Sequence, residues 1–274
     1  MITVLDNPAP GSTHWTDLGD ELNRWEEEGR TATLWWRDDD AVTPSRRLDD
    51  LLTVAGAIPV SLAVIPANAE PALAGWLERH GSPSVRVLQH GYRHANHASA
   101  GKKSEFPASR PREAVKADLA LGRARLAELF GPRALTVLAP PWNRFDDSFL
   151  PLLAEIGIRG ISKIKARFSA HPEPGVFEAN MHVDLVSWRT DRGFIGEAVA
   201  LGGLVAHLRA RRSGDADPDE PTGLLTHHLV QDEGTGAFLG RLINLTHNHP
   251  AARWLDADTV FASAAAKSAT EGRA

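Results

Sequence analysis

Short and almost continuously apolar runs recur along the chain, separated by longer segments with helical spacing. The runs occupy residues 33–38, 58–66, 85–90, 134–140, 157–162 and 222–228. Runs of this length without an alternating polar face are typical of strands that are buried on both faces. They therefore predict the strands of a parallel sheet.

Two of the intervening segments carry a clear helix pattern. Residues 111–131 place apolar side chains on one stripe and end in Gly-Pro, a helix stop. Residues 194–214 end in basic side chains and a glycine, as helix C-termini often do. Strand and helix alternate from residue 33 to about residue 250, which predicts an α/β fold of parallel βα units in one sheet or barrel.

No linker divides this pattern, so we expect a single domain over residues 1–274. Residues 1–30 contain an amphipathic segment and predict an N-terminal helical extension. Residues 97–111 predict a mobile loop, and residues 262–274 predict a frayed tail.

Composition narrows the class of protein only slightly. With 42% hydrophobic and 24% charged residues, the chain is ordinary for a globular protein, and a net charge of -5 gives no reason to expect nucleic acid or an acidic membrane as partner. The start resembles no signal peptide and no apolar run is long enough to cross a bilayer, so we expect a cytoplasmic protein. Because cysteine is absent, any bound metal must use imidazole and carboxylate ligands.

Polar side chains follow four of the predicted strands. These are Asp38 to Asp40 after LWWR, His90 and His94 after VRVLQ, the PPWNR stretch at 140–144 after LTVLA, and His227 and His228 after GLLT. In parallel βα architectures the carboxyl ends of the strands gather at one edge. The sequence therefore predicts one functional site built from all four.

A metal site is the first interpretation of the histidines. His90 and His94 are four residues apart, so on a helical turn both imidazoles point the same way, and one aspartate of the acidic run would complete a set of two histidines and one carboxylate. In an extended chain Asp38 and Asp40 would point one way and Asp39 the other, unless the strand is already turning. The alternatives are solvated or structural histidines and an acidic run that caps a helix.

The later motifs add a proton donor and an apolar wall. We expect one of His227 and His228 to be a core residue and the other to protonate a leaving group. Pro141 stiffens its turn, and Trp142 offers a flat surface beneath a sugar ring or an acyl methyl, or is simply a packed tryptophan.

Five motifs in this order resemble the polysaccharide deacetylase family, the NodB-homology carbohydrate esterases. They are RDDDA (37–41), HGYRH (90–94), APPW (139–142), DLVSW (184–188) and LLTH (224–227). The resemblance implies a distorted (β/α) barrel of about seven parallel strands. It also implies a metal-dependent hydrolase, with zinc or another divalent cation, that removes an N-acetyl group or similar amide from a carbohydrate-like substrate.

The resemblance assigns roles to individual residues. Asp39 would be the catalytic base, and Asp40, His90 and His94 would hold the metal. A shifted assignment, with Asp38 as base and Asp39 as ligand, stays open.

On the other side of the site, the resemblance makes His227 the general acid. Asp184 and Trp188 match the motif that orients and packs it. Arg37, Asp38, Pro141, Trp142 and Arg144 are the remaining supporting or substrate-binding candidates.

The chain departs from the family pattern at two positions. Ala139 stands where members usually carry an arginine, so the group that orients the base must come from Arg37 or Arg144, or be absent. Gly91 stands where a threonine or serine usually follows the first metal histidine. A small-molecule amidase of the same superfamily and a catalytically silent carbohydrate-binding barrel are therefore the alternative hypotheses.

Overall fold

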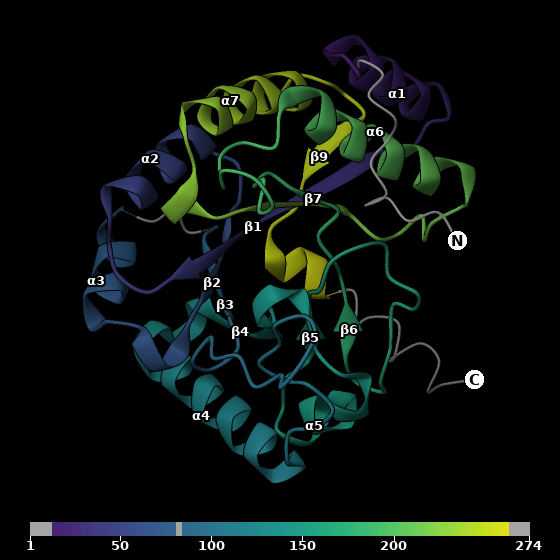
Figure 1. The fold of residues 1–274 in the computed structure, drawn as a ribbon. Helices are drawn as coiled ribbons and strands as arrows, with labels where there is room; N and C mark the ends of the chain where they lie inside the picture. Colours follow the sequence, from purple (N-terminus) through teal and green to yellow (C-terminus); the bar gives the residue numbers. More distant parts are fainter. Residues whose placement is uncertain (1–12, 81–83, 263–274) are drawn as a thin grey trace.

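A computed structural model describes residues 13–80 and 84–262. Its centre is a parallel sheet whose strands run in the order β6-β5-β4-β3-β2-β1-β8-β7, with β9 paired to the start of β1. The sheet curls into a half-barrel, and helices α1 to α7 lie around its outside (Figure 1). The strands are β1 (Ala32–Ala41), β2 (Ser61–Val64), β3 (Arg86–Gln89), β4 (Ala134–Leu138), β5 (Gly160–Ile161), β6 (Phe177–Glu178), β7 (Val183–Asp184), β8 (Thr222–Thr226) and β9 (Ala252–Trp254).

Each apolar run contains one of these strands, so the strand predictions are confirmed. The sheet has nine strands where about seven were expected, because β6, β7 and β9 are only two or three residues long and leave no periodic pattern. The α-helices are α1 (Trp15–Glu27), α2 (Arg46–Ala55), α3 (Pro71–His80), α4 (Arg112–Phe130), α5 (Leu150–Glu155), α6 (Glu197–Ser213) and α7 (Glu233–His247). The predicted helices at 111–131 and 194–214 correspond to α4 and α6.

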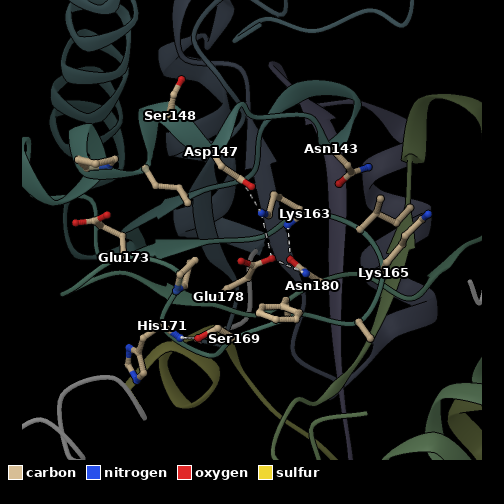
Figure 2. Close-up of a pocket in the computed structure, with 16 residues that line it drawn as sticks. Asn143, Asp147, Ser148, Lys163, Lys165, Ser169, His171, Glu173, Glu178 and Asn180 are labelled. Carbon is tan, nitrogen blue, oxygen red and sulfur yellow. Dashed lines mark hydrogen bonds and ion pairs between the residues drawn. The ribbon is translucent and has the colours of Figure 1, made fainter. Parts of the chain in front are cut away.

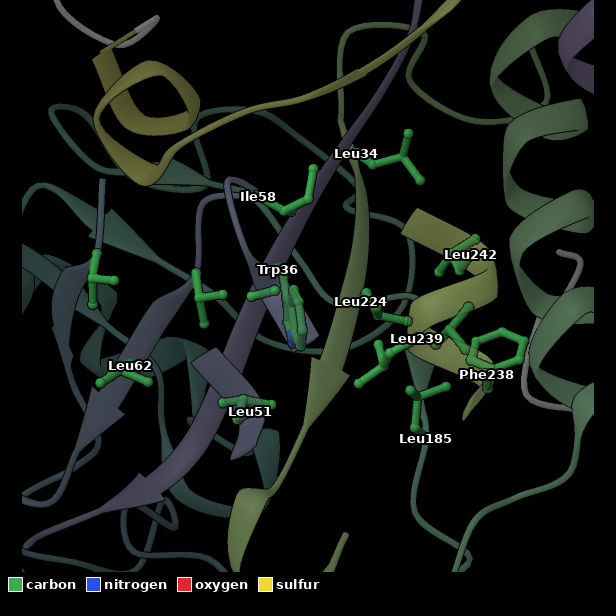
Figure 3. Packing of buried hydrophobic residues seen from close by; sticks show 14 of the residues in the cluster. Leu34, Trp36, Leu51, Ile58, Leu62, Leu185, Leu224, Phe238, Leu239 and Leu242 are labelled. Atoms are coloured by element: carbon green, nitrogen blue, oxygen red, sulfur yellow. The ribbon is translucent and has the colours of Figure 1, made fainter. Parts of the chain in front are cut away.

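Alternate residues of β1 belong to different layers of the core. Leu34 and Trp36 face outward into the cluster that α2 and α7 cover (Figure 3). Trp35 faces the inside of the barrel, where it packs against Phe261 and donates from Nε1 to the Asn180 carbonyl oxygen. Both faces of β1 are therefore buried, which is why its sequence is apolar without alternation.

The amphipathic segment near the N-terminus forms α1, which packs against α6. Leu18, Leu22 and Trp25 bury the apolar face of α1, and Arg212 of α6 donates to Glu21 of α1 at 2.7 Å. The expected frayed tail falls almost entirely on residues 263–274, which lie outside the described part of the chain. Within residues 13–80 and 84–262, no helix is both long enough and apolar enough to cross a membrane.

The segment at 97–111 is better fixed than the sequence indicated. Ser104, Glu105 and Phe106 are buried, and the Asp146 N–H donates to the carbonyl oxygen of Phe106. The stretch is a loop, as predicted, but its mobility was overestimated at residues 104–106, because a buried aromatic and a buried carboxylate anchor them against the turn after β4.

Candidate metal centre and active site

Three of the predicted site residues meet at the carboxyl end of the central strands. Asp40 lies near the end of β1, His90 directly follows β3, and His94 lies in the turn after it. Asp40 Oδ1 is 3.2 Å from His90 Nε2 and 3.4 Å from His94 Nε2. One ligand atom from each residue lies within 4.8 Å of the other two, so the three groups could share one ion.

The hydrogen bond of His90 leaves the correct ring nitrogen free for a metal. His90 Nδ1 is 2.9 Å from the carbonyl oxygen of Ala139, which can only accept. Nδ1 therefore carries the proton, and in the neutral ring Nε2 presents its lone pair toward Asp40. Asp40 Oδ1 is buried and has no hydrogen-bond partner within the described residues. Two imidazole nitrogens and one carboxylate oxygen fit zinc or a similar divalent cation.

The charged groups of the site shift one another's pKa values. Burial opposes ionisation of His90, but the carboxylates of Asp39 and Asp40 outweigh it and raise the pKa of His90. Burial likewise opposes ionisation of Asp40, yet the contact with His90 and the neighbouring imidazoles hold its pKa well below the usual range. Burial and the charge of His90 lower the pKa of His94. A cation would take the place of the proton on His90.

The backbone is bent to bring these ligands together. Asp40 has a φ of 72° and His94 a φ of 55°, both in the left-handed region. The bend in β1 coincides with a shift in its register against β2 between Asp38 and Ala41. The strand is therefore already turning at Asp40, the case in which the alternation of an extended chain was not expected to hold.

Asp39 is held by a buried arginine on its own strand. Arg37 Nε donates to Asp39 Oδ1 at 2.8 Å, and Arg37 Nη2 donates to Oδ2 at 2.9 Å. Burial opposes ionisation of Asp39, but Arg37, His90 and His227 together outweigh it and lower the pKa of this carboxyl. Arg144 instead donates to the carbonyl oxygen of Lys103 at 2.7 Å. Of the two arginines left open by the sequence, Arg37 is therefore the one that orients Asp39.

Arg37 is itself fixed from two distant parts of the chain. Its Nη1 donates to both the carbonyl oxygen (2.8 Å) and the hydroxyl (2.7 Å) of Ser162, and its Nη2 donates to Asn143 Oδ1 at 2.6 Å. The guanidinium thus has partners on every side, so the carboxylate of Asp39 has one orientation.

Asp38 is occupied on the side of β1 that faces β8. It accepts hydrogen bonds from the Thr226 hydroxyl at 2.6 Å and from the His228 N–H at 2.9 Å. It also pairs with His228 Nδ1, and this carboxylate outweighs burial and raises the pKa of His228. Asp38 therefore fixes the turn after β8, and His228, which is 1% exposed against 8% for His227, is the more deeply buried member of the histidine pair.

His227 lies between two carboxylates at the mouth of the site. Its Nε2 is 3.9 Å from Asp39 Oδ2 and its Nδ1 is 3.9 Å from Asp184 Oδ1, so both distances exceed a hydrogen bond. Trp188 packs edge-on against the imidazole at 4.7 Å and donates from Nε1 to Asp184 at 2.7 Å. Burial raises the pKa of Asp184. The residues expected to surround His227 are thus brought together.

Trp142 borders the metal ligands rather than His227. It lies in the 3-10 turn Pro141–Asn143, and its ring centroid is 4.4 Å from that of His94. Both Trp142 and Asn143 have a φ of 55°. This strained turn presents the indole to His94 and the Asn143 amide to Arg37.

A cavity of about 800 Å³, lined by both polar and apolar side chains, adjoins the site through Asn143 (Figure 2). Lys163 lies within it between Asp147, at 3.5 Å, and Glu178, at 3.4 Å. Phe168 also lines the cavity, and its side chain is fully exposed. The cavity offers amide, carboxylate and ammonium groups beside one free aromatic ring, a combination suited to a polar ligand.

A second group of potential ligands, His182, His207 and Glu220, is fully buried at the opposite end of the strands. His182 Nδ1 accepts the Gly223 N–H at 2.8 Å, so a neutral ring carries its proton on Nε2, which faces Glu220 at 3.5 Å. That nitrogen has no lone pair for a metal. Burial and the charge of Arg211 lower the pKa of His182. The three residues instead form hydrogen bonds to surrounding groups, His182 to Gly223, His207 to Thr222 and Glu220 to the N–H groups of Arg167 and Asn180.

Three supporting residues escaped the sequence reasoning. Ser162 and Asn143 hold Arg37, and Glu105 lies buried against the turn between His90 and His94. Asn143 stands inside a quoted motif, but nothing in the local pattern marks Ser162 or Glu105, because their partners are distant in the sequence.

Comparison of the sequence with models of protein families gives no match, and comparison with curated proteins gives none either. Comparison with solved structures matches a candidate polysaccharide deacetylase from Mycobacterium smegmatis with a TM-score of 0.64 and 17% identity, covering 96% of this chain and 96% of that chain. A CE4 esterase from Streptococcus mutans matches with a TM-score of 0.55 and 12% identity, covering 89% and 95%. A mutant of a CE4 family pseudoenzyme with restored enzymatic activity matches with a TM-score of 0.52 and 12% identity, covering 85% and 68%.

At these identities the likeness establishes the fold. The chain shares the curled parallel sheet of structures described as polysaccharide deacetylases and CE4 esterases, over most of its length. The expected NodB-like distorted barrel is therefore confirmed.

Proposed function

We propose that this chain is a metal-dependent deacetylase of the polysaccharide deacetylase family, built as a single catalytic domain. It would hydrolyse an N-acetyl group, or a similar amide, on a carbohydrate-like substrate. The observation that carries the proposal is the meeting of Asp40, His90 and His94 at one point, with Asp39 and His227 beside them. A barrel that only binds carbohydrate has no use for this combination.

Asp40, His90 and His94 would hold zinc or another divalent cation. A bound cation would polarise the acyl carbonyl and supply a water of lowered pKa. The lone pair that the Ala139 carbonyl leaves on His90 Nε2, and the unpartnered Asp40 Oδ1, support this set of ligands.

Asp39 and His227, which face each other, would carry out the proton transfers. Asp39 would accept a proton from the attacking water, because Arg37, His90 and His227 favour its carboxylate form and Arg37 orients it. His227 would donate a proton to the departing amine as the amide C–N bond breaks, leaving acetate and a free amine. Asp184 and Trp188 would hold the imidazole of His227 in place.

The adjoining cavity supports a substrate larger than a simple amide. Its polar side chains and the exposed ring of Phe168 suit the hydroxyl groups and apolar faces of a sugar. Trp188, which is 45% exposed beside His227, offers a second ring at the mouth. A linear or cyclic small amide would leave these surfaces unused.

Metal analysis combined with an assay for acetate release tests the proposal. We expect about one zinc per chain in the wild type, with release of acetate from N-acetylated sugars. His94→Ala should lose both the metal and the activity, whereas His247→Ala, at an exposed histidine of α7, should lose neither.

Two results would contradict the proposal. Equal metal content in wild type and His94→Ala would remove the proposed ligand set. Metal without acetate release from any N-acetylated sugar would rule out deacetylation of sugars. The activity must be measured directly, because one protein of this fold is a pseudoenzyme.

A further inference from the structure

The turn between His90 and His94 rests on a buried carboxylate. Glu105 Oε1 accepts the N–H of Arg93 at 2.8 Å, and its Oε2 accepts the N–H of Tyr92 at 3.2 Å. The side chain of Glu105 is completely buried. Both oxygens therefore bind the main chain that joins the two metal-site histidines.

The carboxylate occupies the space that a side chain at position 91 would need. Gly91 has a φ of 61°, and a Cβ built on it would lie 1.9 Å from Glu105 Oε2 and 2.6 Å from Pro141 Cδ. No residue with a side chain fits there unless Glu105 and Pro141 move. Gly91 and Glu105 are thus matched to each other.

The same turn is held from its other side. Gln89 Nε2 donates to the carbonyl oxygen of Gly91 at 3.0 Å and to that of Leu119 in α4 at 3.1 Å. Together Gln89 and Glu105 hold main-chain groups of three successive residues between the histidines. That is what a left-handed His94 requires, because its conformation has to be imposed by its surroundings.

Glu105 is itself in a fixed position. The neighbouring Phe106 is fully buried and packs edge-on against Phe145, which follows the turn after β4. Arg110 Nη1 donates to the carbonyl oxygen of Glu105 at 3.3 Å, and the Phe106 N–H donates to the hydroxyl of Ser104. The carboxylate can therefore act as a rigid support.

We propose that Glu105 is a positioning residue of the metal site: it fixes the turn that sets His94 Nε2 opposite His90 Nε2 and Asp40. The inference rests on the proposed metal site, but the ordering of the turn is a property of the metal-free chain. Loss of Glu105 leaves all three ligands present and disorders only their spacing. Groups that orient metal ligands typically change metal affinity by about 10- to 100-fold.

Zinc affinity, measured by competition with a chromogenic chelator, provides the first test. We expect Glu105→Ala to bind zinc about 10- to 100-fold more weakly than wild type. Glu105→Gln keeps the size of the side chain and one accepting oxygen, so it should recover part of the affinity. Glu128→Gln, at an exposed position of α4, is the matched control and should bind as wild type does. If Glu105→Ala fails to fold, the Gln variant decides the outcome.

Hydrogen exchange of the metal-free proteins provides the second test. The amides of Tyr92 and Arg93 should exchange faster in both Glu105 variants, while the amides of β2 and β3 stay protected. Zinc affinity unchanged within about twofold, or unchanged exchange at Tyr92 and Arg93, would overturn the role of Glu105 and leave the proposed function standing. A wild-type chain that binds no zinc would instead overturn both.

Discussion

Arg37 shows how one contact sets the chemistry of a neighbouring residue. Burial alone would raise the pKa of Asp39, and the paired guanidinium is the largest of the neighbouring charges that lower it, with His90 and His227 adding to it. The same contact uses both oxygens of Asp39, so it also fixes the direction of the carboxylate. Arg37 therefore contributes to both the charge and the orientation of the proposed base.

We expect Arg37→Lys to reduce kcat for acetate release by about 100-fold, because an ammonium group cannot bind both oxygens of Asp39 and also reach Ser162 and Asn143. Zinc content should stay at the wild-type level, since Arg37 contacts none of the proposed ligands. Arg144→Lys is the matched control and should retain activity, because Arg144 contacts the carbonyl oxygen of Lys103. Equal losses in the two variants would contradict the role given to Arg37.

At the scale of elements, the ends of β1 and β8 form one unit. Asp38 near the end of β1 caps the 3-10 turn His228–Val230 and pairs with the buried His228. Thr226 joins the contact by donating to Asp38 while it accepts from Trp36 Nε1. Because His227 is the first residue beyond β8, this unit determines where its imidazole lies.

Asp38→Asn should lower the free energy of unfolding by about 3 kcal/mol, because it leaves a buried His228 without its charge partner. Activity should fall as His227 shifts, while zinc binding persists at Asp40, His90 and His94. Urea unfolding and metal analysis measure the two effects, with Asp50→Asn on the exposed face of α2 as control. A loss of zinc comparable to that of His94→Ala would show that Asp38 belongs to the ligand set.

At the scale of the whole molecule, the two ends of the strands carry different polar groups. The carboxyl ends carry the proposed metal site, and the opposite end buries His182 stacked on His207, with ring centroids 3.4 Å apart. Burial lowers the pKa of both rings. Arg211 and Arg167 lower the pKa of His182 further, and His182 and Arg211 lower that of His207 against the opposing charge of Glu220. The folded chain therefore keeps both imidazoles neutral.

A cytoplasmic location stays a prediction from the sequence.

The stacked pair of His182 and His207 should make the fold sensitive to acid. The pKa of each ring is lower in the folded than in the unfolded chain, so the unfolded chain binds more protons below about pH 6.5. The free energy of unfolding is therefore unaffected by the titration of these two histidines above that pH. Below it, the free energy of unfolding decreases by up to about 1.4 kcal/mol per pH unit for each histidine. Urea unfolding of metal-free protein between pH 7.5 and 5 should show a smaller slope for His207→Gln than for wild type. Identical slopes would contradict this, and His247→Gln is the exposed control.

The sequence by itself determined which end of the sheet carries the chemistry. Apolar runs such as 33–38 and 85–90 mark parallel strands, and the carboxyl ends of parallel strands share one edge. Any polar residue that directly follows such a run must therefore lie at that edge. The meeting of Asp40, His90 and His227 could be foreseen for this reason, before any contact was known.

Only the tertiary structure decided how these residues are used. Arg37 is held by Ser162 and Asn143, which are 125 and 106 residues away in the chain. Glu105 supports the turn between His90 and His94, and nothing in the sequence of that turn except Gly91 indicates that it needs a support. Periodicity reports relations between residues a few positions apart, so it carries no trace of such contacts. The turn at Asp40, which places two successive aspartates on one site, arises in the same way, from the packing of β1 between β2 and β8.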